Sequence, residues 1–311
     1  MAAYDQNDPA GKAAAERAAR LSRQELRVVT PDAGFLSGAH ASLSDLWAHR
    51  QLWLLLTRRE LKARYKDSVL GFVWTLVRPM INLLIYYYAI GKILRAAESI
   101  ENFAVYVFAG LTAWGLFSQI IASSTASIIA NAGIVKKVYL PREIFPLSSA
   151  GAAFVDFLSQ LAILIVGSLA IVQQFDLGNV ALYGPISLLV LLTWGIALGL
   201  FLSAVNVYLR DVQYLVEVLL MIGFWLTPSV YSYEMVIGSA PAWVAEIYLL
   251  NPTAVAVMGF QKAFWAVGSP DAVWPGDLML RLVIALGIGV VLMFLAQRLF
   301  ARLQRNFAQE L

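Results

Sequence analysis

The chain has 311 residues, of which 60% are hydrophobic and 14% charged, with a mean hydropathy of +0.69 and a net charge of +3. Soluble domains carry about 25% charged residues, so this composition excludes an ordinary soluble domain and indicates a membrane protein. The lack of cysteine excludes disulfides, thiolate nucleophiles and cysteine-bound metals. Both histidines, His40 and His49, precede the first apolar segment. We therefore expect neither a metal nor a cofactor in this chain, and no nucleic-acid partner.

The N-terminal region divides into two parts. Residues 1–42 are rich in Ala, Arg and Asp rather than apolar, so they are not a cleavable signal peptide, and we interpret them as a mobile cytoplasmic tail. In residues 43–70, Leu46, Trp47, Trp53 and Leu54 recur at near-helical spacing between polar residues. This pattern predicts an amphipathic helix in the inner membrane interface, followed by a segment near a cytoplasmic gate. A simple lipid anchor is the alternative.

The first membrane span is predicted at 72–94, where an apolar run of about 20 residues is long enough to cross a bilayer. Five cations stand just before it, namely Arg58, Arg59, Lys62, Arg64 and Lys66. Because an excess of Lys and Arg beside a span stays on the cytoplasmic side, the N-terminus is expected to be cytoplasmic.

Hydropathy predicts five further spans, at 103–129, 147–172, 182–208, 212–231 and 278–300. The apolar segment 232–277 is broken by Gly and Pro, which predicts short re-entrant or interfacial helices on the outer side. With six spans, all but four of the 23 Lys and Arg residues are inside, whereas a seventh span would move Arg298, Arg302 and Arg305 outside. We expect an all-α protein of six transmembrane helices, with 71–305 as the membrane domain and 306–311 as a second cytoplasmic tail.

Four segments in order carry a resemblance to a known family: RYKDSVLGFVWTLVRP, IVKKVYLPREIFPLS, NVYLRDVQYL and LLNPTAVAVMGFQKAFW. Over residues 43–305 the chain resembles the permease subunit of type-2 ABC transporters. The most similar branch exports O-antigen, teichoic acid, capsule and galactan chains.

The resemblance implies that the loop at 133–148 is the coupling element that seats in a partner ATPase. Its candidate residues are Lys136, Lys137, Tyr139, Pro141, Arg142 and Glu143. The chain has no G-x-x-x-x-G-K-[ST] phosphate loop, so it is expected not to be an enzyme, and ATP and Mg belong to the partner. An ordinary cytoplasmic loop with positive charge is the alternative.

Candidate gate and diphosphate-binding residues lie at the inner side of the first span: Arg58, Arg59, Arg64, Tyr65 and Arg78. Cations there suit an anionic diphosphate, although attraction to anionic lipids explains them equally well. Charged groups inside a membrane are usually paired or functional. We therefore expect Asp156 or Glu217 to form a structural pair with Arg78 rather than a proton relay.

Aromatic residues are dense in the first, second and fifth spans, and an aromatic ring offers a flat face to a sugar ring. The candidates to line a channel are Tyr86, Tyr106, Phe117 and Phe224. The alternative is that such residues belong to the aromatic belts or to packing.

The resemblance implies a homodimer with two ATPase subunits in a bacterial plasma membrane, with both termini cytoplasmic. Its substrate would be a polysaccharide linked to a polyprenyl diphosphate, moved through a channel between the two copies. An ABC exporter of small hydrophobic drugs or lipids is the alternative. An intramembrane enzyme acting on lipid-linked sugars is a third reading, but the outer loops offer only scattered carboxylates for such chemistry.

Overall fold

The computed structural model describes residues 44–65, 71–137, 140–173, 176–269 and 271–311, and every regular element within these ranges is helical. The predicted tail at 1–42 lies outside the described residues. Four described helices are long and apolar enough to cross a membrane: α6 (Phe103–Ala130), α8 (Ile144–Ile171), α9 (Leu177–Tyr208) and α14 (Leu278–Leu303). They coincide with four of the predicted spans, which confirms the all-helical class and the membrane character.

The other two predicted spans are less regular. Span 72–94 is built from three consecutive segments, η1 (Gly71–Val73), α4 (Trp74–Tyr86) and the π-helical η2 (Tyr87–Ile93). Pro79 lies inside α4, where its ring and missing N–H interrupt the helical ladder. Span 212–231 contains α10 (Val212–Trp225), which has 14 residues, whereas a regular crossing needs about 20. The count of six spans therefore remains a prediction.

The apolar segment before α14 folds into short helices, at the places where Gly and Pro interrupt the sequence. They are α11 (Tyr233–Ser239), α12 (Ala242–Tyr248), α13 (Pro252–Phe264) and η3 (Ala266–Gly268). Asn251 caps α13 by accepting a hydrogen bond from the Thr253 amide, and Pro252 occupies the first turn, where its missing N–H costs little. α12 and α13 meet at 85°, which fits either a broken span or a re-entrant loop.

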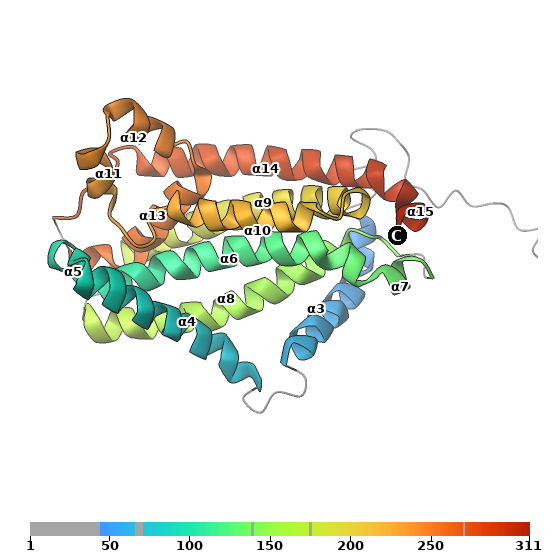
Figure 1. The fold of residues 1–311 in the computed structure, drawn as a ribbon, viewed down its shortest axis with the longest axis horizontal. Helices are drawn as coiled ribbons and strands as arrows, with labels where there is room; N and C mark the ends of the chain where they lie inside the picture. Colours follow the sequence, from blue (N-terminus) through green and yellow to red (C-terminus); the bar gives the residue numbers. More distant parts are fainter. Residues whose placement is uncertain (1–43, 66–70, 138–139, 174–175, 270) are drawn as a thin grey trace, which may run out of the picture. The chain divides into compact units, whose positions relative to one another are not determined.

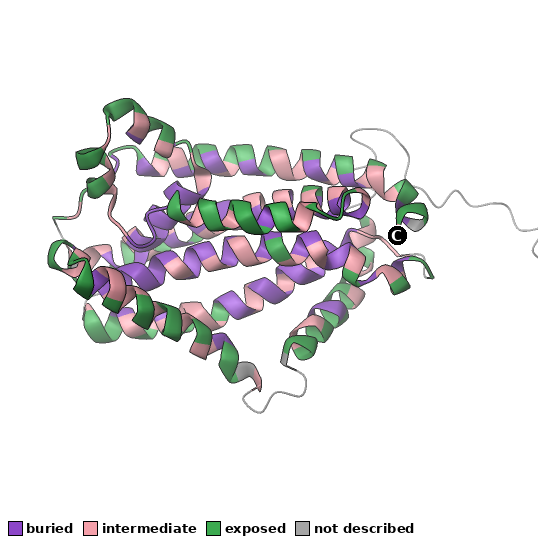
Figure 2. Ribbon diagram, in the orientation of Figure 1, coloured by how far each residue is buried: buried purple, intermediate pink, exposed green. Residues whose placement is uncertain are grey.

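The long helices pack around α6, which contacts α8, α9, α10 and α13, and α14 packs along α9 (Figure 1). Buried residues concentrate on α6 and α13, while the outward faces of α10 and α14 are exposed (Figure 2). At one end of these helices lie α5 (Ala96–Ser99), α11 and α12, and at the other lie α7 (Ala132–Val135) and α15 (Phe307–Glu310).

The last residues differ from the expected tail, because η4 (Gln304–Asn306) and α15 fold against the ends of α9 and α14. Phe307 is fully buried and contacts the rings of Tyr208 and Phe300. An aromatic side chain four residues before the last residue is thus part of the core.

The six-span arrangement places 232–277 outside and both termini inside. Because the chain has no cysteine, single cysteines introduced at Ser239 and Ser269 should react with a membrane-impermeant maleimide added to intact cells. Cysteines at Ser44 and Gln309 should react only after permeabilisation. Ser99→Cys is the control, since it is external with either six or seven spans. Labelling of Ser239 and Ser269 from opposite sides would show that α12 and α13 cross the membrane.

Candidate functional site

A seam of hydrogen bonds joins α3 (Arg50–Tyr65) to the first half of α8. Its α3 members recur at intervals of three or four residues and therefore share one face of the helix. The contacts are Trp53 Nε1 to the Leu147 carbonyl (2.9 Å), Thr57 Oγ1 to the Ser148 carbonyl (3.4 Å), Ser149 Oγ to Glu60 Oε1 (2.8 Å) and Arg64 Nη1 to Asp156 Oδ2 (2.6 Å). Burial raises the pKa of Glu60, and the two serine hydroxyls counteract this by stabilising the carboxylate.

The ion pair of Arg64 with Asp156 is the contact of this seam that lies farthest along both helices. The Asp156 side chain is 5% exposed, and the Gln119 amide donates to the same carboxylate oxygen at 2.7 Å. Asp156 is twelve residues beyond the start of α8, which is about 18 Å along the helix axis. The sequence led us to expect Arg78 as the partner of a buried carboxylate. The structure gives the ion pair to Arg64 instead, and Glu217 is exposed on the outer face of α10.

Two adjoining cavities, of about 340 and 510 Å³, form one groove between α4, α6, α8 and α10. They are adjacent, because both are lined by Arg78, Pro79 and Gln160. Hydrogen-bonding side chains follow the length of this groove, namely Arg64, Thr75, Arg78, Asn82, Ser118, Gln119, Asp156 and Gln160. A row of amide, hydroxyl and charged groups inside an apolar helix bundle marks a place where a polar ligand can be accommodated.

Aromatic rings gather at the wider end of the groove. Tyr86 of α4 and Trp114 of α6 both contact Phe224 of α10, with ring centroids 5.7 and 6.1 Å apart. α10 comes this close to α6 because residue 223 is glycine, since a Cβ there would lie 2.8 Å from the Trp114 ring. Two of the four predicted channel aromatics, Tyr86 and Phe224, are therefore brought together.

The other two predicted aromatics lie elsewhere. Phe117 is buried behind Trp114, with a centroid distance of 5.6 Å, and does not line the groove. Tyr106 is buried and donates to the carbonyls of Pro228 and Tyr231 near the other end of α6. Sequence reasoning missed Trp114 and the amides Gln119 and Gln160 as lining residues. A search for every hydrogen-bonding side chain inside a predicted span would have found the two glutamines.

The predicted gate cations separate into two groups. Arg64 and Arg78 line the groove, whereas Arg58 is exposed on α3 and Arg59 donates to the Asn131 side chain at the end of α6. Tyr65 is the last residue of α3. Within the described ranges no group of three or more His, Asp or Glu side chains is arranged to hold a metal ion.

The predicted coupling segment connects α7 to α8. Lys136 and Lys137 are exposed at the end of α7, and residues 138–139, which include Tyr139, lie outside the described residues. Pro141 is partly buried, and the Arg142 guanidinium donates to the Gln304 carbonyl and lies over the Phe307 ring.

Glu143, at the start of α8, accepts a hydrogen bond from Gln297 Nε2 at 3.0 Å. Burial raises the pKa of Glu143 to about 7, although the Gln297 amide and the nearby Arg298 favour its charged form. The segment is thus fastened to α14 at Arg142 and Glu143, and its two lysines face outward.

Comparison of the sequence with known proteins assigns the chain to a family. Residues 51–265 match the ABC-2 type transporter family. The chain is 30% identical, over 267 residues, to the O-antigen export system permease protein RfbA of Myxococcus xanthus, which covers 86% of this chain and 98% of that protein. It is 30% identical over 216 residues to RfbA of Klebsiella pneumoniae, covering 68% of this chain and 80% of the relative. It is 25% identical over 239 residues to the polysialic acid transport protein KpsM of Escherichia coli, covering 75% and 89% respectively. The chain therefore belongs to the ABC-2 type transporter family, as a multi-pass membrane permease without an ATPase domain of its own.

Proposed function

We propose that this chain is the permease of an ATP-driven exporter that moves a polysaccharide linked to a polyprenyl diphosphate from the cytoplasm across the bacterial plasma membrane. The observation that carries the proposal is the groove, which combines a row of amide and hydroxyl groups with aromatic rings gathered at its wider end, inside an apolar bundle. Sugars present hydroxyl groups at their edges and C–H groups on their faces, so both kinds of lining residue have a role. The relatives named for O-antigen export and polysialic acid transport support a saccharide substrate.

The cations of the groove suit the diphosphate. Arg78 is exposed there, and Arg64 retains a 29% exposed side chain beside its partner Asp156. A guanidinium binds phosphate oxygens through two parallel hydrogen bonds, which a lysine cannot do. In this proposal the diphosphate binds near Arg78 and Arg64, and the sugar chain extends toward Tyr86 and Phe224.

A second copy of the chain would complete the channel. α10 buries Val216 alone among its described residues, and it turns large apolar side chains such as Leu215 and Leu219 away from the protein, with Glu217 among them. A charged side chain on such a face is costly in lipid, so a protein or water-filled surface opposite it is favoured. Because α10 also lines the groove, a partner copy on this face would enclose the groove between two protomers.

Energy would come from a separate ATPase in two copies, which binds ATP and Mg on the cytoplasmic side. The surface that binds the ATPase would be the segment containing Lys136 and Lys137. Hydrogen bonds of Arg142 and Glu143 attach this segment to the end of the last span, which supports the transmission of ATPase movements to that span. In this arrangement both termini are cytoplasmic.

The function can be tested by reconstitution with the cognate ATPase. Proteoliposomes should move a polyprenyl-diphosphate-linked oligosaccharide in an ATP-dependent manner, and the permease purified alone should hydrolyse no ATP. Tyr86→Ala and Phe224→Ala should each raise the half-saturating substrate concentration about 2- to 10-fold, because a stacked ring contributes roughly 0.5–1.5 kcal/mol. Phe201→Ala, at an exposed aromatic of α9 outside the groove, is the control. Transport of small hydrophobic dyes, with no transport of oligosaccharide, would instead favour a drug or lipid exporter.

The coupling segment makes a separate prediction. The variant Lys136→Glu/Lys137→Glu should weaken association with the ATPase roughly tenfold, since reversing charges at an interface creates repulsion where attraction is expected. Arg142 is left intact in this variant because it holds the fold. Arg302→Glu/Arg305→Glu, which reverses two exposed cations at the end of α14, should leave association unchanged. Equal association of both variants with the ATPase would contradict a coupling role for the two lysines.

The Arg64–Asp156 pair is expected to hold α3 against α8. A double-mutant cycle with Arg64→Ala and Asp156→Ala, measured by unfolding of the detergent-solubilised protein, should give a coupling energy of about 1–3 kcal/mol. Asp156→Ala alone should be the more damaging change, because it leaves Arg64 and Gln119 without their shared acceptor. Additive effects of the two substitutions would show that the pair does not couple the helices.

A further inference from the structure

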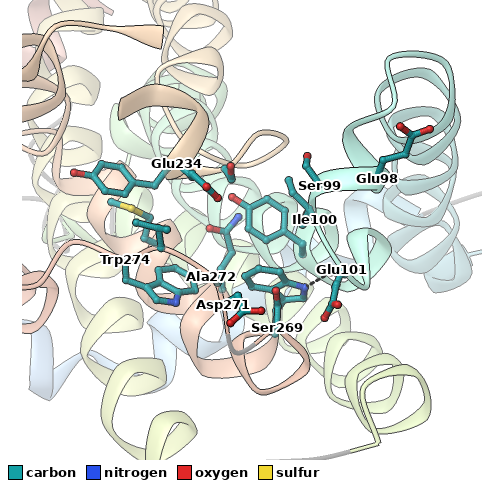
Figure 3. Close-up of a pocket in the computed structure, with 16 residues that line it drawn as sticks. Glu98, Ser99, Ile100, Glu101, Glu234, Ser269, Asp271, Ala272 and Trp274 are labelled. Carbon is teal, nitrogen blue, oxygen red and sulfur yellow. Dashed lines mark hydrogen bonds between the residues drawn. The ribbon is translucent and has the colours of Figure 1, made fainter. Parts of the chain in front are cut away.

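A third cavity, of about 320 Å³, lies away from the groove, where α11, α13 and the start of α6 meet (Figure 3). It is lined by four carboxylates and four large aromatic side chains, and none of its described lining residues is Lys or Arg. The carboxylates are Glu98, Glu101, Glu234 and Asp271, and the aromatics are Tyr106, Tyr233, Trp265 and Trp274. In Figure 3, Glu234 lies on one side of the cavity, with Glu98 and Glu101 on the opposite side.

One buried group in this lining has an unmet hydrogen bond. Gln261 of α13 is fully buried, and its amide nitrogen donates to the Pro228 carbonyl at 2.7 Å. That contact fixes the orientation of the amide, because exchanging its nitrogen and oxygen would place two acceptors together. Its Oε1 then has no partner within the described part of the chain. Buried polar atoms without a partner are rare, so this oxygen gives the cavity lining an acceptor that no described side chain satisfies.

Two protein donors near Gln261 are already engaged. The Tyr106 hydroxyl donates to the carbonyls of Pro228 and Tyr231, and Trp265 Nε1 donates to the Glu101 carbonyl at 2.6 Å (Figure 3). The lining therefore presents several acceptors, namely one amide oxygen and the carboxylates. A ligand that supplies several donors is favoured.

The aromatic lining defines the rest of the ligand. Tyr106 and Trp274 both pack edge-on against Trp265, with ring centroids 4.8 and 6.0 Å from that of Trp265. Rings beside hydrogen-bonding groups suit a ligand with flat apolar faces and polar edges. A sugar residue has both, with hydroxyl donors at its edges. A divalent cation would instead need several carboxylates converging on one point, and the described residues form no such group.

We propose that this cavity is an outer saccharide-binding site that accepts uncharged or amino-bearing sugar residues and disfavours acidic ones. The proposal rests on the proposed function, because it assigns the site to the polymer as it leaves the groove, on the side that the six-span arrangement makes external. Selectivity follows from charge. The carboxylate of an acidic sugar would approach four like charges, one of which, Glu98, is paired with Arg95, whereas a hydroxyl or ammonium group would meet acceptors.

The test uses the full-length permease in nanodiscs, with saturation-transfer NMR to detect weak binding. The probes are a galactose tetrasaccharide and a sialic acid tetrasaccharide. We expect saturable binding of the galactose probe, a loss of at least fivefold in affinity in Trp274→Ala, and no loss in Trp243→Ala. Trp243 is the matched control because it is an exposed tryptophan of α12 outside the cavity.

Charge selectivity is tested with a second variant that does not disturb the core. Glu234→Gln/Asp271→Asn removes the charge of two exposed side chains while keeping their size and one acceptor oxygen each. It should raise the affinity for the sialic acid probe about fivefold or more and leave the galactose probe within twofold. Glu246→Gln, at an external carboxylate that pairs with Arg281 outside the cavity, should change neither.

Three results would overturn the proposal: no galactose binding by the wild type, equal effects of Trp274→Ala and Trp243→Ala, or binding that requires a divalent cation. The wild type is also assayed for ATP-driven oligosaccharide transport in proteoliposomes. Transport without binding at the cavity would reject the outer site and leave the proposed function intact. Binding at the cavity without transport would reject the function.

Discussion

Close contact around α6 is the constraint on which the other helices depend. α6 is apolar enough to lie in lipid, yet 72% of its most apolar stretch is buried inside the protein. Lipid tails are as apolar as leucine, so helices associate in a membrane through close packing and interhelical hydrogen bonds. Gly199 of α9 supplies the first, since a Cβ there would lie 2.8 Å from the Ser124 side chain. Two interhelical hydrogen bonds accompany this packing. Ser124 of α6 donates to the Pro146 carbonyl of α8, and Asn206 of α9 donates to the Thr125 carbonyl of α6.

The same logic explains why the groove lies where it does. Where Gly195 and Gly199 of α9 pack on α6, the two helices close the space, whereas α4 contains Pro79 and continues into a π-helix. Irregular helical segments are frequent at functional sites. Two regular helices that pack closely would leave no space for a groove. The polar residues of α6 and α8 that face α4 are consequently left in contact with a cavity. The irregular first span therefore forms one wall of the groove.

Sequence patterns predicted the long helices well, because an uninterrupted apolar run of sufficient length has few alternatives in a membrane. They also predicted short helices where Gly and Pro divide the segment before α14. They did not predict that Arg64 would pair with Asp156, since the partners are 92 residues apart and no local pattern relates them. Hydropathy could not separate Tyr86 and Phe224, which face the groove, from Phe117, which is buried, because all three lie in equally apolar spans. The folding of Phe307 into the core was missed for a similar reason: its contacts are with distant aromatic rings.

The seam between α3 and α8 also bears on how the chain is made. Its residues on α3 leave the ribosome before the first span, but their partners on α8 follow 89 to 94 residues later, as the separations of Glu60 from Ser149 and of Trp53 from Leu147 show. At a synthesis rate of about 5–20 residues per second, the interval is roughly 5 to 20 s. Throughout that time Glu60 and Arg64 must remain hydrated or bound to lipid headgroups or insertion machinery. The docking of α3 is therefore a late event of biogenesis, completed when the third predicted span has entered the membrane.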